Sequence, residues 1–267
     1  MSQLDEGVRS YVESNGLDSL LGMPVVAATR TVYESVDPSV TVPYPPDWPD
    51  LVRLHRTVRE RRVTTILEFG CGWSTLVMAD ALRRNEEEHG EVVATRLRRS
   101  NPFEIHVVDD VAAYLDAALE RIPLDLRRHV HPLLSGVEMT KFAGRICTQY
   151  GQLPNVAPDF IYLDGPSQAS ATGEVQGIST RHPDRLPMSC DLLRVEPFLL
   201  PGTLVLVDGR TANARFLRAH LYRNWTYRWE SDGDVHWLEL RERPLGRYNL
   251  AQIEYCLGEG WLTALPE

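Results

Sequence analysis

The chain of 267 residues is long enough for one large α/β domain, because α/β folds commonly reach ~250 residues around a single core. With 43% hydrophobic and 24% charged residues, the composition excludes an intrinsically disordered chain and a small disulfide scaffold. The 28 basic and 37 acidic residues give a net charge of -9, which disfavours DNA or long RNA as a partner.

The cysteines and the N-terminal segment indicate the compartment. The four cysteines, at positions 71, 147, 190 and 256, include no C-x-x-C pair of the kind that holds zinc or performs redox chemistry. Isolated cysteines suit a reducing cytosol. The first residues, MSQLDEGVRS, lack the apolar core of a signal peptide, and no segment approaches the roughly 18 apolar residues of a membrane span. We therefore expect a soluble, cytoplasmic protein with no membrane partner.

Residues 1–62 differ from the rest of the chain and are expected to form an N-terminal helical cap. Their beginning has weak helical spacing, and the prolines between positions 43 and 49 predict a stiff elbow. Asp47 is suited to cap a helix whose apolar residues recur on one face. Residues 63–267 are expected to form the main domain.

In the main domain, short apolar runs alternate with longer helical segments, which is the pattern of βαβ units around a parallel sheet. The predicted strands are 63–69, 104–109, 127–134, 159–164 and 202–208. Helical spacing of apolar residues predicts helices over 111–122 and from Thr211 onward.

The end of the pattern is different in kind. Residues 224–240 contain two aromatic-rich segments around Ser-Asp-Gly-Asp, which predicts an antiparallel hairpin at a sheet edge. The polar stretch 83–102 is interpreted as a solvated excursion. The whole pattern predicts a Rossmann-like, doubly wound α/β fold with a mostly parallel sheet and an antiparallel C-terminal hairpin.

The sharpest motif is ILEFGCGWST, residues 66–75, which joins a buried strand to a helix. Gly70 and Gly72 permit a tight turn and a close approach of a ligand to the backbone, and Ser74 and Thr75 can cap the helix. A dinucleotide fingerprint would need glycine in place of Thr75, and a Walker-type phosphate loop is absent. A nucleotide-like ligand beyond the first strand is favoured over a plain tight turn.

With Glu68 ahead of the glycines, the E-x-G-x-G-x-S form resembles motif I of class I S-adenosylmethionine-dependent methyltransferases. The resemblance implies that this turn packs against the methionine part of the cofactor. The residues assigned to the cofactor here are Glu68, Gly70, Cys71, Gly72, Ser74 and Thr75. The resemblance also implies an acidic residue at the end of the second strand that accepts hydrogen bonds from the ribose hydroxyls of the cofactor. Asp109 follows that strand directly and is the better candidate, whereas Asp110 could equally cap the next helix.

Two later strands also end in a carboxylate, and both carboxylates are expected to face one cleft. Asp164 precedes a Gly-Pro break and resembles motif IV of the family, and Asp208 ends the next strand. Either could hold or remove the proton of a hydroxyl or amine during methyl transfer. Alternatively, the pair could bind Mg²⁺, as in metal-dependent O-methyltransferases, although Gly209 departs from their Asp-Asn or Glu-Asp pattern. A turn role for each aspartate also remains open.

The polar connection 168–190 is too long for a routine loop and is expected to be a lid or binding loop. His182 within it is a candidate catalytic base. Arg181, and Arg210 just after Asp208, are candidates for contact with a small anion. A surface role is the alternative for each.

His129 and His131 alternate in a predicted strand and would point the same way, a spacing open to metal binding. With no third ligand evident nearby, a packed or surface pair is favoured, and no residue is assigned as a metal ligand.

Together with the resemblance, these features predict an S-adenosylmethionine-dependent methyltransferase acting on an oxygen or nitrogen of a small molecule. The first candidate acceptor is a metabolite rich in hydroxyls or containing sugar. The expected partner is a small-molecule acceptor, with a homo-oligomer possible. A non-catalytic cofactor-binding protein is the first alternative. An NAD-dependent oxidoreductase is the second, disfavoured by the missing third glycine.

Overall fold

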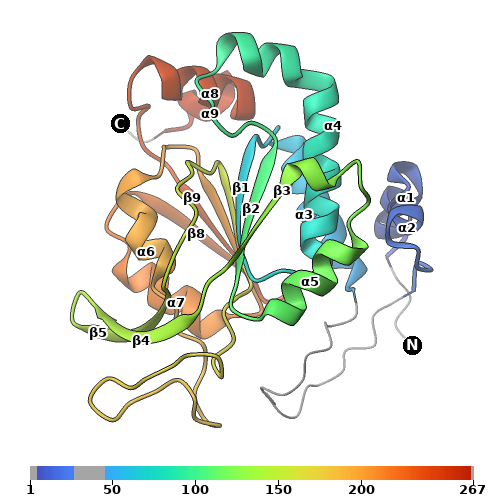
Figure 1. Cartoon of the computed structure of the whole chain (residues 1–267). Helices are drawn as coiled ribbons and strands as arrows, with labels where there is room; N and C mark the ends of the chain where they lie inside the picture. The colour runs from blue at the N-terminus through green and yellow to red at the C-terminus, as the bar shows by residue number, and fades with distance from the viewer. Residues whose placement is uncertain (1–4, 27–45, 266–267) are drawn as a thin grey trace.

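The computed structural model describes residues 5–26 and 46–265, and a seven-stranded sheet forms its centre (Figure 1). The strands are β1 (Thr65–Phe69), β2 (Glu104–Asp109), β3 (Val130–Leu134), β6 (Phe160–Leu163), β7 (Leu204–Asp208), β8 (Trp225–Glu230) and β9 (Val235–Leu240). They lie in the order β3-β2-β1-β6-β7-β9-β8. The first five strands in this order, β3, β2, β1, β6 and β7, pair in parallel, whereas β9 is antiparallel to both β7 and β8. The predicted mostly parallel sheet with an antiparallel C-terminal hairpin is confirmed.

The central strands are buried on both faces, as their unbroken apolar runs predict. Every residue of β1 and β6 is buried, and successive side chains enter two separate apolar cores. Ile66, for example, packs into one core and Leu67 into the other. The edge strand β3 carries Pro132, a residue without a backbone N–H that sheets tolerate mainly at their edges.

Helices cover both faces of this sheet (Figure 1). One face carries α1 (Glu6–Asn15), α2 (Leu17–Leu21), α3 (Trp48–Glu60), α4 (Trp73–Arg96) and α5 (Ala112–Arg121), and the other carries α6 (Asp191–Val195) and α7 (Thr211–His220). Single 3₁₀ turns occur at Arg127–His129 and Glu196–Phe198. The last helices, α8 (Arg247–Leu257) and α9 (Glu259–Thr263), follow the C-terminal hairpin, and α8 approaches Gly202 just ahead of β7.

The polar stretch 83–102, interpreted from the sequence as a solvated excursion, is largely helical. Helix α4 continues without a break over residues 73–96 because polar side chains in its second half have partners on neighbouring elements. Asn85 is fully buried and donates hydrogen bonds of 3.0 Å to the carbonyls of Val58 and Val63. The wide separation between the glycine turn and β2 therefore comes mainly from a long helix.

Three side chains connect the N-terminal helix α1 to the main domain. The Tyr11 hydroxyl lies 2.8 Å from Nδ1 of His55 in α3, and Nε2 of His55 lies 3.1 Å from the Asp80 carboxylate in α4. Burial lowers the pKa of His55, which favours the neutral ring in this network. The N-terminal helices thus share a core and a polar network with the sheet.

The helix expected after the proline elbow is present. Helix α3 begins directly after Asp47, although the Asp47 side chain makes no capping hydrogen bond to the helix. Residues 1–4 and 27–45 of the expected cap, including residues 43–45 of the elbow, lie outside the described residues.

A second hairpin, which the sequence patterns above do not predict, follows β3. Strands β4 (Val137–Phe142) and β5 (Arg145–Tyr150) pair antiparallel beside the main sheet. The long polar connection 168–190 packs against them. Thr172 exchanges backbone hydrogen bonds of 2.8 and 2.9 Å with β4, and Cys190 donates one of 2.9 Å to β5. The connection predicted to be a lid or binding loop is therefore anchored near both ends.

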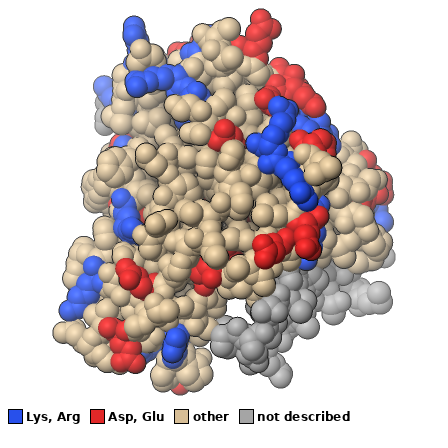
Figure 2. Space-filling model, in the orientation of Figure 1, with Lys and Arg blue, Asp and Glu red and all other residues tan. Residues whose placement is uncertain are grey.

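None of the helices in the described parts of the chain is long and apolar enough to span a lipid bilayer. On the face drawn in Figure 2, acidic and basic side chains are interspersed between broad areas that carry neither.

Candidate functional site

Four central strands bring their carboxyl ends to one edge of the sheet, the lower edge in Figure 1. Gly70 follows β1, Asp109 ends β2, Asp164 follows β6 and Asp208 ends β7. Adjacent strands in a sheet lie about 4.8 Å apart, so these four positions share one short edge. The structure therefore brings together the glycine turn and the strand-end carboxylates that the sequence predicts as site residues.

Gly70 is required by the turn itself. Its φ of 87° lies in the left-handed region, and a Cβ there would come within 3.0 Å of the Gly165 nitrogen. In the other direction, a Cβ on Gly165 would lie 2.7 Å from the Gly70 nitrogen. The Phe69 carbonyl accepts hydrogen bonds from Asp164 and Gly165 at 2.9 and 2.6 Å. The turns after β1 and β6 thus pack backbone against backbone.

Gly72 is different, because the fold does not require glycine there. Its φ of 174° is extended backbone that any residue adopts, and the nearest described atom to an added Cβ is the Ser74 hydroxyl at 3.9 Å. Gly72 is also the N-cap of α4, where backbone N–H groups favour electronegative ligand atoms. The missing side chain leaves open space at the start of this helix.

Glu68 holds the residues that follow the turn through hydrogen bonds made on its buried side. It is fully buried, and its two carboxylate oxygens accept hydrogen bonds from Ser74 at 2.5 Å and Thr75 at 2.8 Å. Burial raises the pKa of Glu68 to about 8, against the effect of these two hydrogen bonds. The Thr75 hydroxyl also accepts from the Gly72 N–H at 3.2 Å. Thr75 thus satisfies a donor at the helix start, as predicted, while Ser74 binds Glu68.

Asp109 holds two backbone segments together. One carboxylate oxygen accepts the Cys71 N–H at 2.9 Å and the other accepts the Val111 N–H at 2.8 Å. Burial raises the pKa of Asp109, and these hydrogen bonds oppose the rise. Asp110, which the sequence left as a possible helix cap, instead interacts with Ser170 of the long loop. The Val111 N–H that precedes α5 is satisfied by Asp109.

Asp164 and Asp208 lie side by side, because the register pairs the residues just before them, Leu163 and Val207. Asp164 is exposed, but the protein around it displaces much of the nearby water and raises its pKa to about 6. Burial and nearby carboxylates, including that of Asp50 in α3, raise the pKa of Asp208 to about 8. Two neighbouring carboxyls with different proton affinities can accept and donate protons in the same cleft near neutral pH.

Two further polar groups act on this pair. The Tyr162 hydroxyl donates a hydrogen bond of 2.9 Å to Asp208. Arg210 is buried and donates to the carbonyls of Asp164 at 2.9 Å and Pro166 at 2.5 Å. Arg210 therefore holds the turn after β6 in place. Its buried Nε has no hydrogen-bond partner among the described residues, and its contact with a small anion remains a prediction.

The predicted loop residues lie apart from this network. The His182 side chain is 50% exposed, and its Nδ1 accepts the Asp184 N–H at 3.2 Å. Arg181 is also exposed, and its N–H donates to Ser179 at 3.1 Å. The described contacts of His182 do not include Asp164 or Asp208, so its role as a base remains a prediction.

The prediction that His129 and His131 point the same way is wrong. His129 belongs to the 3₁₀ turn before β3, where it is buried with its Nδ1 2.8 Å from the Phe103 carbonyl oxygen. His131 lies in β3 and stacks on His106 of β2. The conformation changes at the start of the strand, so the alternation assumed from the sequence does not extend to His129.

The sequence did not assign three residues to the site. Gly165 was noted only as part of the Gly-Pro break after Asp164, although Asp-Gly-Pro at a strand end favours a tight approach to the neighbouring turn. Tyr162 lies inside an apolar run, and Asp50 lies 114 residues ahead of Asp164 in the chain. Neither carries a local signal, because strand pairing and helix packing alone place them near the carboxylates.

The order of the strands decides between the related doubly wound folds. Numbered along the chain, the sheet strands run 3-2-1-4-5-7-6, with the seventh antiparallel between the fifth and sixth. A dinucleotide-binding Rossmann sheet runs 3-2-1-4-5-6. The inserted antiparallel strand thus distinguishes this sheet from the dinucleotide-binding one. No protein-family model matches the sequence, and no curated protein matches it.

Solved structures with a similar arrangement include methyltransferases. The O-methyltransferase TomG from Streptomyces achromogenes, in complex with SAM, shares 15% identity over 90% of this chain and 91% of its own, with a TM-score of 0.39. A SAH-bound Podospora anserina methyltransferase shares 12% identity over 90% of each chain, with a TM-score of 0.46. An O-methyltransferase from Bacillus cereus, in complex with SAH, shares 13% identity over 89% and 91%, with a TM-score of 0.37. At these scores the similarities carry no argument about function.

Proposed function

We propose that the protein is an S-adenosylmethionine-dependent methyltransferase that acts on an oxygen or nitrogen of a small molecule. The observation that carries the proposal is the inserted antiparallel strand β9, which separates this sheet from the dinucleotide-binding one. It is found together with a glycine turn of the E-x-G-x-G-x-S form and with carboxylates at the neighbouring strand ends.

The residues around the first turn fit the cofactor. Gly72 leaves space at the start of α4 that a side chain would fill, and Glu68 holds the two hydroxyl residues of that turn. Asp109 already accepts two backbone N–H groups, yet each carboxylate oxygen has a further lone pair for a ribose hydroxyl. We assign Asp110 to the same region, where it also contacts the long loop. When bound, the cofactor would supply the methyl group.

Asp164 and Asp208 are proposed to handle the proton of the acceptor. With a pKa raised only to about 6, Asp164 is mostly ionised at neutral pH and can accept a proton or hydrogen bond from a hydroxyl or amine. Asp208, with a pKa of about 8, mostly retains its proton and can donate a hydrogen bond. This pairing suits an acceptor rich in hydroxyls. His182 remains a candidate base on the anchored loop.

A magnesium-dependent version of this reaction is the alternative that the sequence left open. Within the described ranges 5–26 and 46–265, Asp164 and Asp208 are not part of a group of three potential metal ligands. Mg²⁺ usually keeps several waters and is held by only one or two protein carboxylates, so Asp164 and Asp208 could hold it together with waters and an acceptor hydroxyl. Bound there, it would lower the pKa of that hydroxyl. Activity that survives exhaustive EDTA treatment would retire the metal-dependent alternative.

Two other functions compete with this proposal. A non-catalytic cofactor-binding protein would keep the glycine turn without an acceptor cleft, but two carboxyls with separated pKa values at adjacent strand ends favour chemistry. An NAD-dependent oxidoreductase would use a related sheet, but Thr75 stands where the third glycine would be.

Calorimetry with S-adenosylmethionine, S-adenosylhomocysteine and NAD separates these functions. We expect the first two to bind with one site per chain and NAD not to bind. Absence of binding by both adenosyl compounds would refute the proposal. If they bind, incubation with isotope-labelled S-adenosylmethionine and pooled hydroxylated or amino metabolites, followed by mass spectrometry, distinguishes an enzyme from a binding protein.

A further inference from the structure

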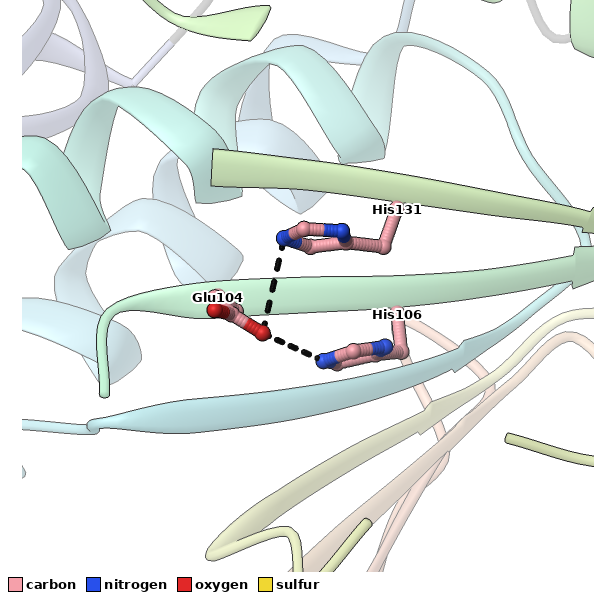
Figure 3. A group of neighbouring side chains, drawn as sticks. All are labelled: Glu104, His106 and His131. Atoms are coloured by element: carbon pink, nitrogen blue, oxygen red, sulfur yellow. Dashed lines mark hydrogen bonds and ion pairs between the residues drawn. The ribbon is translucent and has the colours of Figure 1, made fainter. Parts of the chain in front are cut away.

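A group of three side chains with metal-ligating atoms lies at the other end of the sheet from the proposed cofactor site. Glu104 and His106 belong to β2, and His131 belongs to the edge strand β3. The register pairs His106 with His131, and the strand period of two puts Glu104 on the same face. Figure 3 shows the carboxylate and both imidazole rings turned toward one another. One potential ligand atom from each residue lies within 4.8 Å of the other two.

The polar contacts of this group converge on one atom. Oε2 of Glu104 is at hydrogen-bond distance from Nε2 of His106 (2.9 Å) and from the Asn101 amide nitrogen (2.8 Å), and Nε2 of His131 makes an ion-pair contact with it at 3.4 Å. His131 thus approaches an oxygen whose two lone pairs are already used. A cation between the rings and the carboxylate would bind all three groups, because neutral imidazoles would then direct lone pairs at it.

We propose that Glu104, His106 and His131 form a binding site for a divalent transition-metal ion, with zinc as the preferred occupant. Two imidazoles and one carboxylate suit zinc, which takes nitrogen ligands at about 2.0–2.1 Å and carboxylate oxygen at about 2.0–2.2 Å. Ligands at those distances in tetrahedral geometry lie roughly 3.4 Å apart. The oxygen-to-nitrogen separations of 2.9 and 3.4 Å are close to this value.

Bringing the two imidazoles closer requires little change in the fold. The rings stack with centroids 4.8 Å apart and an interplanar angle of 16°. The His131 side chain is 45% exposed, so it can rotate on its solvent side, whereas His106 is only 12% exposed. The exposed ring also provides an entry path for the ion.

Asn101 supports the proposed zinc site from outside the set of three ligands. The Asn101 amide can keep its hydrogen bond to the Glu104 carboxylate and orient it, as outer-shell partners of metal ligands do. With three protein ligands, zinc would keep one position for water or an added ligand. The ion would link β2 to the edge strand β3 independently of the proposed methyl transfer.

Zinc titration of the metal-free full-length protein tests the proposal. We expect one zinc ion per chain by calorimetry, a rise in melting temperature with zinc, and a tetrahedral electronic spectrum when Co²⁺ replaces it. His131→Ala should abolish all three, since it removes an exposed ligand with little risk to folding. Asn101→Ala should retain the site with affinity reduced about 10- to 100-fold.

A matched control is available in His220→Ala. His220 lies on α7, where its Nδ1 is 2.7 Å from the Phe216 carbonyl oxygen, and it belongs to no three-ligand group among the described residues. This variant should bind zinc like the wild type. The proposal is overturned if the wild-type protein takes up no stoichiometric zinc, or if His131→Ala binds zinc as tightly as His220→Ala.

Discussion

Replacing Gly72 by alanine separates the two reasons for a glycine in the turn after β1. The added Cβ would meet no described atom closer than the Ser74 hydroxyl at 3.9 Å, and the φ of 174° suits alanine. The folded chain can therefore accept the methyl group. The proposed cofactor would clash with this methyl group, because the Cβ projects from the N-cap of α4 into the space assigned to the ligand.

The expected magnitudes differ for stability and affinity. Alanine is a poorer N-cap than glycine, which destabilises the fold by less than about 1 kcal/mol. Alanine also lowers the conformational entropy of the unfolded chain, which stabilises the fold by about 0.4–1 kcal/mol. These effects largely offset each other, so the melting temperature should change by no more than about 2 °C. Loss of close contact at the cofactor should weaken S-adenosylhomocysteine binding at least tenfold, or roughly 1.4 kcal/mol.

The assay combines thermal unfolding with calorimetry on the same preparation. Gly90→Ala is the matched control, since it makes the same chemical change within α4, where the nearest atom to an added Cβ is Glu86 Cγ at 3.6 Å. The control should bind S-adenosylhomocysteine like the wild type. Undiminished affinity in Gly72→Ala would refute the reasoning, since the space in front of this residue would then not hold the cofactor.

Three further predictions follow from the same edge of the sheet. Gly165→Ala would place a Cβ 2.7 Å from the Gly70 nitrogen, so urea unfolding should show a loss of roughly 1–3 kcal/mol. Burial raises the folded pKa of Glu68 from 4.5 to about 8, so native protein binds a proton that unfolded chain releases, and stability from this group falls as pH rises between these values. Urea unfolding of Glu68→Gln across this range should show a smaller fall than wild type. Asp50→Asn removes a neighbouring negative charge and should lower the pKa of Asp208 from about 8, measured by carbon NMR of the carboxyl groups.

Each of these has a contrary result. A Gly165→Ala variant as stable as the wild type would mean that the two turns can separate at little cost. An equal fall in stability with pH in Glu68→Gln and wild type would assign the proton to another group. A pKa of Asp208 that does not move in Asp50→Asn would mean that the Asp50 charge contributes nothing, leaving burial and Asp164 as the causes.

The alternation of strands and helices could be predicted because it depends on residues near one another in the chain. Apolar runs such as the one before Gly70 form strands buried on both faces, and Ser-Asp-Gly-Asp makes the C-terminal hairpin wherever it packs. The turn residues Glu68, Gly70 and Thr75 interact within eight residues, so their spacing predicted much of their arrangement.

The second half of α4 illustrates where local patterns were insufficient. Its polar residues read as a solvated segment, yet Asn85 is buried because Val58 and Val63 offer carbonyl groups to its amide. A polar side chain is placed in a core when its partners are there, and those partners come from another part of the chain.

The sequence by itself determined the strands of the main sheet in chain order, the glycine turn and the acidic ends of the strands. The tertiary structure decided what those residues face: Gly165 against Gly70, Arg210 on carbonyl groups, and His131 with His106. The physical reason is that backbone preference and hydrophobic period act over a few residues, whereas strand register sets which distant side chains meet.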